Sequence, residues 1–253
     1  MPVTSGMVLI VCPLVFLASL IDAIGGGGGL ISLPAYMLAG LPTALASGSN
    51  KFSSSCGLIM STYKYARSGK ILLKPAACAI AGALPGAYLG AELLKRTPEP
   101  VIRAIMLTVI PVMAVILLLK RDSAQQSKPM NAARYIACLI VGLLCGFYDG
   151  FCGPGAGTLM IMGLTWMAGM SMITANGSAK LVNLASNAGA LVSHLINGNV
   201  VFGLALPAMV CSVAGAWCGA KLALKKGSGM IRWVMCGVLV LLLAKLIFES
   251  ITA

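Results

Sequence analysis

Apolar residues run through most of the 253-residue chain, and short polar stretches divide the runs. This pattern predicts long helices over residues 7–23, 42–66, 73–94, 100–120, 133–149, 171–196, 200–220 and 230–248. A helix needs about 20 residues to cross the hydrocarbon of a bilayer, so the apolar segments 30–39 and 158–170 are too short to cross upright. The expected fold class is an all-α polytopic membrane protein with about eight full spans and two short segments.

The composition supports a membrane protein, because 59% of the residues are hydrophobic and only 9% are charged. A soluble domain carries about 25% charged residues. The apolar start of the chain lacks a basic region and a small-residue cleavage site, so we interpret it as a membrane segment rather than a signal peptide.

The second half of the chain repeats landmarks of the first at an offset of 128–129 residues. Matching features are three alternating glycines (Gly25, Gly27, Gly29 and Gly153, Gly155, Gly157), a Gly-Ser-X-Lys step ending at Lys51 or Lys180, and, with one residue of slippage, Asp22 and Asp149. We therefore predict repeat one over residues 1–122, a cytoplasmic linker over 123–130 and repeat two over 131–253.

The net charge of +12 comes mainly from basic residues in three loops, over residues 64–74, 120–134 and 221–232. Such clusters are typical of cytoplasmic loops. They are not interleaved with stacking aromatic residues, which argues against a nucleic-acid partner. The uncharged turn 195–199 is then expected outside, so the two repeats are inverted, and inverted repeats with glycine-broken segments are typical of secondary transporters.

Glycine runs break each predicted repeat inside an apolar region. A helix that restarts there presents backbone N–H groups and the positive end of its dipole, and glycine lets an anion approach them. We expect Gly27, Gly28 and Gly155 in an anion site; the alternative is that the glycines only permit close helix packing. For the pairs Gly86/Gly90 and Gly215/Gly219, packing is the favoured interpretation.

Charged and polar residues at membrane depth usually mark a pathway or a pair. We expect Lys51 and Lys180 to bind the anion from opposite repeats, aided by polar groups at Ser49, Asn50, Ser178, Asn183 and Asn187. The alternative is that each lysine forms a structural ion pair with Asp22 or Asp149. These two aspartates are also candidates for proton coupling, which would make protons a second partner.

The segments LISLPAYMLAGLPTALASGSNK, GFYDGFCGPGAGT and AKLVNLASNAGAL are similar to the TauE/SafE (TSUP) family of membrane proteins, and the resemblance covers essentially the whole chain. It implies a multi-pass transporter in the bacterial inner membrane that carries small anions, mainly sulfur-containing ones such as sulfite, sulfonates and thiosulfate. The chain departs mildly, with more glycines in the first break and Ser-Asn-Lys where the family often has Thr-Asn-Lys.

Two other classes of function fit the sequence less well. A membrane-embedded serine protease would rely on Ser49 and His194, but the motifs around both are wrong for it. A divalent metal transporter or a metalloenzyme needs clustered ligands, whereas the chain has one histidine and six acidic residues. We expect no enzyme activity, metal or cofactor; the sequence leaves open the exact substrate, the transport direction, the coupling ion, a homo-oligomer and whether the short segments cross.

The inverted topology predicts that a cysteine-free variant carrying single cysteines at Lys70 or Gly198 is labelled from opposite sides of the membrane. An impermeant thiol reagent added outside should react at position 198 and not at position 70. Labelling of both positions by that reagent would contradict the topology.

Overall fold

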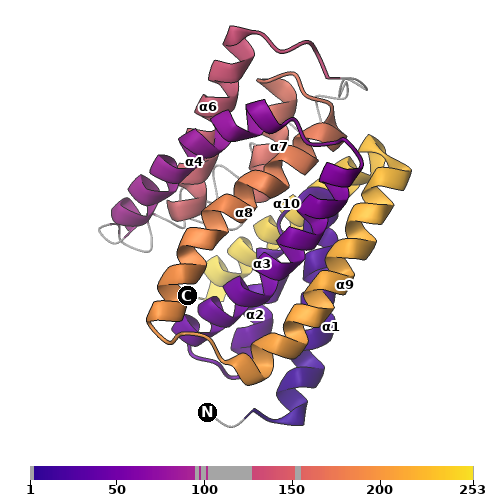
Figure 1. The fold of residues 1–253 in the computed structure, drawn as a ribbon. Helices are drawn as coiled ribbons and strands as arrows, with labels where there is room; N and C mark the ends of the chain where they lie inside the picture. The colour runs from indigo at the N-terminus through magenta and orange to yellow at the C-terminus, as the bar shows by residue number, and fades with distance from the viewer. Residues whose placement is uncertain (1–2, 95–96, 98–100, 102–126, 152–154, 253) are drawn as a thin grey trace.

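The computed structural model describes residues 3–94, 97, 101, 127–151 and 155–252, and within these ranges every regular element is a helix. The elements are α1 (Ser5–Gly25), α2 (Gly29–Leu38), α3 (Thr43–Arg67), α4 (Leu73–Leu94), α6 (Ala132–Phe151), α7 (Ala156–Trp166), α8 (Met172–Ile196), α9 (Phe202–Lys226) and α10 (Ser228–Thr252) (Figure 1). The expected span 100–120 and most of the expected linker lie outside the described residues.

The described helices agree with the ranges expected from the apolar pattern. In both halves a helix of about 20 residues is followed by a short helix, of 10 residues in α2 and 11 in α7, and then by a helix of 25 residues. Helix α9 extends six residues beyond the expected end, to Lys226, where two lysines occupy its last turn. Cations there interact favourably with the negative end of the helix dipole.

Several described helices are apolar, as expected of a polytopic membrane protein. Helices α1, α6 and α9 are long and apolar enough to cross a membrane, with mean hydropathies of 2.6, 1.5 and 1.6. Helices α2 and α7 are apolar but shorter. The total of about eight spans stays a prediction.

Helices α4 and α6 lie side by side and touch through glycines on both partners (Figure 1). A Cβ atom added to Gly86 would overlap the carbonyl oxygen of Leu143, and one added to Gly146 would overlap that of Ala83. The same holds one turn earlier and later on each helix. Small residues at this spacing let two backbones approach closely.

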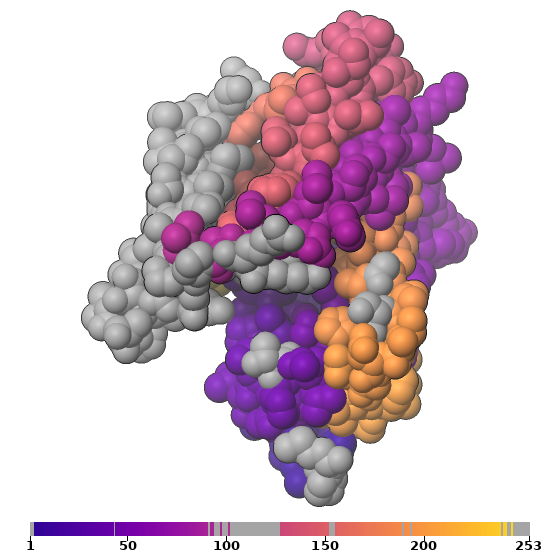
Figure 2. Space-filling model, turned by 90° about the vertical axis from the view of Figure 1, so that its left-hand side faces the viewer, coloured from indigo at the N-terminus to yellow at the C-terminus, as the bar shows by residue number. Residues whose placement is uncertain are grey.

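Helices α1 and α9 make the equivalent contact, where Gly215 and Gly219 lie against the carbonyl groups of Phe16 and Leu20. The packing role expected for the pairs Gly86/Gly90 and Gly215/Gly219 is therefore confirmed. In each case the first helix of one half packs on the fourth helix of the other half. Figure 2 shows α4 and α6 packed together in one part of the surface.

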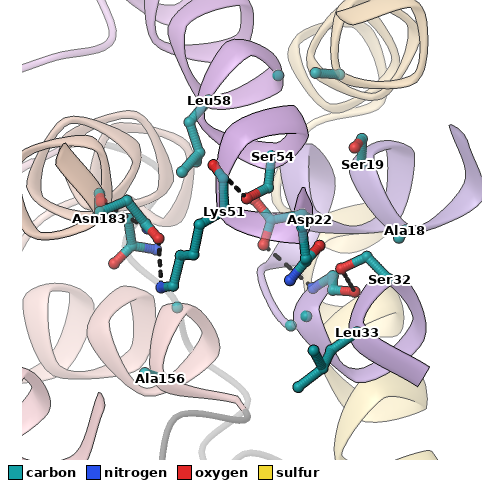
Figure 3. Close-up of a pocket in the computed structure, with 18 of the residues that line it drawn as sticks. Ala18, Ser19, Asp22, Ser32, Leu33, Lys51, Ser54, Leu58, Ala156 and Asn183 are labelled. Atoms are coloured by element: carbon teal, nitrogen blue, oxygen red, sulfur yellow. Dashed lines mark hydrogen bonds between the residues drawn. The ribbon is translucent and has the colours of Figure 1, made fainter. Parts of the chain in front are cut away.

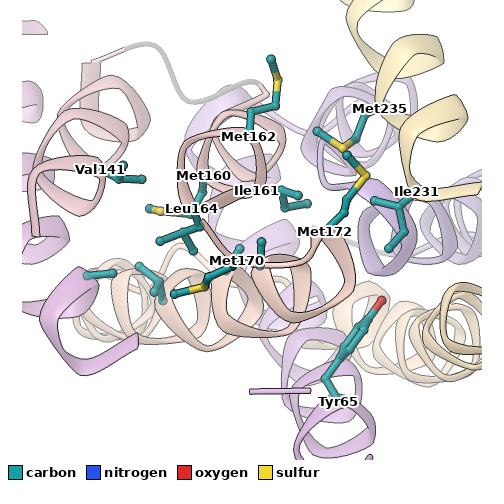
Figure 4. Close-up of a cluster of buried hydrophobic side chains, with 14 of the residues drawn as sticks. Tyr65, Val141, Met160, Ile161, Met162, Leu164, Met170, Met172, Ile231 and Met235 are labelled. Atoms are coloured by element: carbon teal, nitrogen blue, oxygen red, sulfur yellow. The ribbon is translucent and has the colours of Figure 1, made fainter. Parts of the chain in front are cut away.

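The short helix α7 lies inside the protein, since eight of its eleven residues are buried. Its residues Met160, Ile161 and Met162 belong to an apolar cluster that includes Met172 and, from α10, Met235 (Figure 4). A helix too short to cross a bilayer needs such surroundings, because only protein or trapped water can satisfy the polar groups at its ends. Helix α2 is less enclosed, with three of its ten residues buried.

Helices α3 and α8 are antiparallel, and a turn packs against each end of the pair. Gly177, in the second turn of α8, packs on the carbonyl oxygen of Lys70, whereas Gly48 packs on that of Asn199, beyond the end of α8. A helix of 25 residues is about 37 Å long. The turns chosen for the labelling experiment are therefore separated by about that length.

The glycine contact predicts that Gly86→Val lowers the stability of the protein by about 1–3 kcal/mol or more, because the added side chain forces α4 away from α6. Thermal unfolding in detergent measures this loss. Gly237→Val is the control, since nothing lies within 4 Å of a Cβ at Gly237 on α10. Equal melting temperatures for the two variants would show that close backbone contact does not hold α4 to α6.

Candidate functional site

A cavity of about 350 Å³ lies between the two halves of the chain (Figure 3). This volume is at the lower end of the range for small-molecule sites, about 300–1,000 Å³. The lining is largely small or polar and comes mainly from α1, α2, α3, α7 and α8: Ala18, Ser19, Asp22, Gly27, Gly28, Gly29, Ser32, Leu33, Ser47, Asn50, Lys51, Ser54, Gly57, Leu58, Ser61, Asp149, Gly155, Ala156, Gly157, Asn183, Asn187 and Ala216.

The end of α1 beside this cavity has carbonyl groups that the helix itself cannot satisfy. The side-chain amide of Asn176 donates to the carbonyls of Ala23 and Ile24, at 3.2 and 2.6 Å. The hydroxyl of Tyr65 donates to the Ala23 carbonyl at 2.9 Å, and that of Thr158 donates to the last carbonyl of α1 at 3.0 Å. Side chains from α3, α7 and α8 thus stabilise the break.

The glycines of the first break have different roles. Gly26 and Gly27 have φ angles of 80° and 85°, a left-handed conformation that favours glycine. A Cβ atom on Gly27 would also overlap Val238 of α10. Gly27 also lines the cavity, and turn geometry and packing require a glycine there as well.

Gly28 and Gly29 agree better with the expectation that an anion can approach the backbone at this break. The N–H of Gly28 donates to Oδ1 of Asp22 at 3.2 Å, so it holds a carboxylate of the protein itself. Nothing lies within 4 Å of a Cβ built on Gly29, which is exposed and lines the cavity. Gly27, Gly28 and Gly29 all line the cavity, and of the three only Gly29 has open space where a side chain would stand.

Lys180 does not line the cavity. Its side chain is fully buried, and its ammonium lies 2.9 Å from Oδ2 of Asp22 and also donates to the Asp22 main-chain carbonyl. The expectation that both lysines face one cavity is therefore revised. For Lys180 the structural ion pair, the alternative left open by the sequence, is what the structure contains.

Lys51 does line the cavity and is partly exposed to it. Its ammonium donates to the side-chain oxygen of Asn187, whose amide group donates in turn to the main-chain carbonyl of Asn183 at 2.8 Å. Figure 3 shows Lys51 reaching from α3 across the cavity towards the side that carries Asn183. The cation is thus held by a neutral group, while its charge faces open space.

The expected asparagines line the cavity as well. Asn50 is nearly buried, and its side-chain oxygen has no hydrogen-bond partner in the described part of the chain. The side-chain nitrogen of Asn183 lies close to the start of α7, 3.0 Å from a Cβ built on Gly157. Gly155, with a φ angle of 84°, caps the start of α7 at the edge of the cavity.

Ser49 and Ser178 lie outside the cavity and are fully buried. Ser49 accepts a hydrogen bond from the N–H of Val201 at 3.0 Å, and Ser178 accepts one from the N–H of Leu72 at 3.3 Å. Both expected site residues therefore hold a turn at the end of the α3–α8 pair. The glycine and serine of each Gly-Ser step contact the backbone of a neighbouring turn. Of the two residues that directly follow each step, only Asn50 and Lys51 of α3 line the cavity.

A row of serines lies on the cavity face of α3, and its last member, Ser61, is the one that the sequence interpretation missed. Ser47, Ser54 and Ser61 line the cavity with Lys51 and Leu58, and the spacing of three or four residues between neighbours places all five on one helix face. The same spacing can be read from the sequence, where it indicates a polar face on this helix. His194, at the end of α8, also approaches this row, with Nε2 3.3 Å from Oγ of Ser47.

The two aspartates differ in their surroundings. Asp22 is held by Lys180 and by the N–H of Gly28. Asp149 lines the cavity, and within the described residues its carboxylate has no hydrogen bond and no ion pair. Of the two candidates for proton coupling, only Asp149 combines a place in the cavity with an unpaired carboxylate.

Comparison with known proteins supports the membrane interpretation. A family model described as "Sulfite exporter TauE/SafE" matches residues 11–246. The chain is 32% identical over 234 residues to the probable membrane transporter protein YfcA of Escherichia coli strain K12, covering 92% of this chain and 87% of the relative. It is 28% identical over 235 residues to a probable membrane transporter protein of Haemophilus influenzae, covering 93% of this chain and 92% of the relative.

The buried ion pair predicts that Lys180→Ala destabilises the protein by about 3–5 kcal/mol, because it leaves the Asp22 carboxylate without its cation. Thermal unfolding in detergent measures the loss, and Lys51→Ala, which removes no ion pair seen here, is the matched comparison. The double variant Asp22→Asn, Lys180→Gln should regain part of the stability. A parental melting temperature for Lys180→Ala would contradict the structural role.

Proposed function

Because this chain belongs to the TauE/SafE family of membrane transporters, we propose that it is a secondary transporter of small sulfur-containing oxyanions, with the cavity between its halves as the binding site. The observation that carries the proposal is Lys51, a cation that lines the cavity and, within the described part of the chain, donates to the neutral amide of Asn187. The description of the matching family model names sulfite, which favours sulfite, sulfonates or thiosulfate as cargo.

The lining offers an oxyanion several donors at once. The ammonium of Lys51 has three N–H bonds, of which Asn187 uses one. The amide groups of Asn50 and Asn183 and the serine row on α3 supply further neutral donors. Charge-assisted hydrogen bonds of an ammonium to an oxyanion are about twice as strong as neutral ones, so Lys51 is proposed as the main anchor.

The site suits alternating access between two related halves. We infer that residues 1–122 and 131–253 are inverted repeats, supported by the matching order of helix lengths and by the reciprocal contacts α1–α9 and α4–α6. The cavity is lined from both halves. A rocking motion of one half against the other would expose such a site to each side of the inner membrane in turn.

The lining fits a divalent metal or an enzyme reaction less well. Among the described residues, no three histidine, cysteine or acidic side chains gather into a metal site. At the 129-residue offset Ser47 corresponds to Asn176 and Tyr65 to His194, so the contact of His194 with Ser47 is the counterpart of the hydrogen bond of Asn176 with Tyr65. The latter bond supports the end of α1, so we interpret the former as a helix contact rather than a nucleophile and its base.

Replacement of Lys51 by alanine should weaken the binding of methanesulfonate and thiosulfate by about thirtyfold to several thousandfold. Loss of one partner of a buried charge pair costs about 2–5 kcal/mol. Titration calorimetry on the purified protein in detergent measures both affinities. Lys225→Ala is the control, because Lys225 is exposed in the last turn of α9. Parental affinity in a folded Lys51→Ala variant would rule out the proposed site.

A further inference from the structure

Asp22 and Asp149 occupy matching places at the ends of α1 and α6 but have unequal partners. The Asp22 carboxylate lies 2.9 Å from the ammonium of Lys180 and accepts the N–H of Gly28 at 3.2 Å. Within the described residues the Asp149 carboxylate has neither kind of partner, although it lines the cavity. Of the two matching aspartates, Asp22 therefore has a cation and a backbone donor, whereas Asp149 has neither among the described residues.

The lysine that corresponds to Lys180 is Lys51, 129 residues earlier. In this structure its ammonium binds Asn187 instead of a carboxylate. Lys51 and Asp149 nevertheless line the same cavity, and the charge of Lys51 acts on the Asp149 carboxylate. A lysine side chain is a flexible stem with a compact charge, so a modest rotation can change its partner.

Few other charged or titratable groups face Asp149. Asp22 of α1 acts on it electrostatically, and Asp22 already has a cation in Lys180. Cys145 lies one turn earlier on α6 and also interacts with it. Helix α7 carries no titratable side chain, and no titratable residue of α4 is among the groups that act on Asp149. Among the described residues, Lys51 is therefore the cation available to Asp149.

We propose that Asp149 competes with the transported anion for Lys51. In the empty site Lys51 turns from Asn187 to pair with Asp149, as Lys180 pairs with Asp22, and an arriving anion displaces the carboxylate. When the anion leaves, the carboxylate takes its place, so Lys51 regains an anionic partner. This assignment makes Asp149 a residue that sets affinity and promotes release, and it rests on the proposed function.

The arrangement also gives Asp149 a role in selecting the charge of the cargo. With Lys180 and Asp22 neutralising each other, the cavity retains one positive charge from Lys51 and, when its carboxyl group is ionised, one negative charge from Asp149. A displaced carboxylate that stays nearby repels the bound anion, and Coulomb repulsion is proportional to the charge of that anion. The carboxylate therefore lowers the affinity for a dianion by more than it lowers the affinity for a monoanion.

The test compares Asp149→Asn with Asp22→Asn, which remove the same charge from matching positions. Titration calorimetry in detergent uses methanesulfonate as a monoanion and thiosulfate as a dianion. Asp149→Asn should bind methanesulfonate about tenfold more tightly than the parent and should improve thiosulfate binding by a larger factor. Asp22→Asn should lower the melting temperature and tighten neither anion, since it removes a carboxylate already paired with a buried lysine.

Unchanged or weaker binding of both anions by folded Asp149→Asn would overturn the competition. If Asp149→Asn does not fold, Asp149→Ser provides the same comparison with a smaller side chain. Loss of binding in Lys51→Ala together with unchanged affinity in the Asp149 variants would refute this inference and leave the proposed function standing. If the parent binds neither anion, the proposed function fails and the inference fails with it.

Discussion

The architecture depends on how the protein satisfies the backbone of a helix that ends in its interior. The carbonyls at the end of α1 accept hydrogen bonds from side chains of α3, α7 and α8. An unsatisfied backbone group in an apolar environment costs several kcal/mol, so these donors are a condition of the break. Because α7 and α8 belong to the other half of the chain, the break of one half is stabilised by the other. The cavity lies beside these contacts between the two halves.

Glycine residues allow the helix backbones of the two halves to come into direct contact. The backbones of α4 and α6 touch through alternating glycine and carbonyl groups, and so do those of α1 and α9. These contacts leave no room for side chains and join elements far apart in the sequence. Between the two contacts lie α3 and α8, which carry most of the polar residues of the cavity. The site is therefore formed by two polar helices between two pairs of apolar ones.

Much of this arrangement follows from the sequence. The apolar runs and glycine breaks predicted the described helices to within a few residues in most cases, and the small-residue spacing predicted the packing of Gly86 and Gly215. Local pattern was sufficient because helix length and close approach are encoded within a few turns. Lys51, Asn50, Asn183 and Asn187 were likewise recognised, since polar residues stand out in apolar helices.

The sequence was less informative where the two halves of the chain differ in their contacts. Lys51 and Lys180 have similar neighbours along the chain, yet only Lys180 is fully buried against an aspartate. That difference arises from packing between distant helices, which a repeated motif does not encode. For the same reason Ser49 and Ser178 resembled site residues, although each accepts a hydrogen bond from a turn that is distant in sequence.

The position of Lys180 has a consequence for the ionic requirements of the protein. Its ammonium lies at the carbonyl end of a broken helix and bonds both a main-chain oxygen and a carboxylate. Broken helices in secondary transporters often place sodium ions against such oxygens. Here a lysine side chain of the protein itself occupies that place. The carbonyl end of α1 therefore has a covalently attached cation where a dissolved ion would otherwise have to bind.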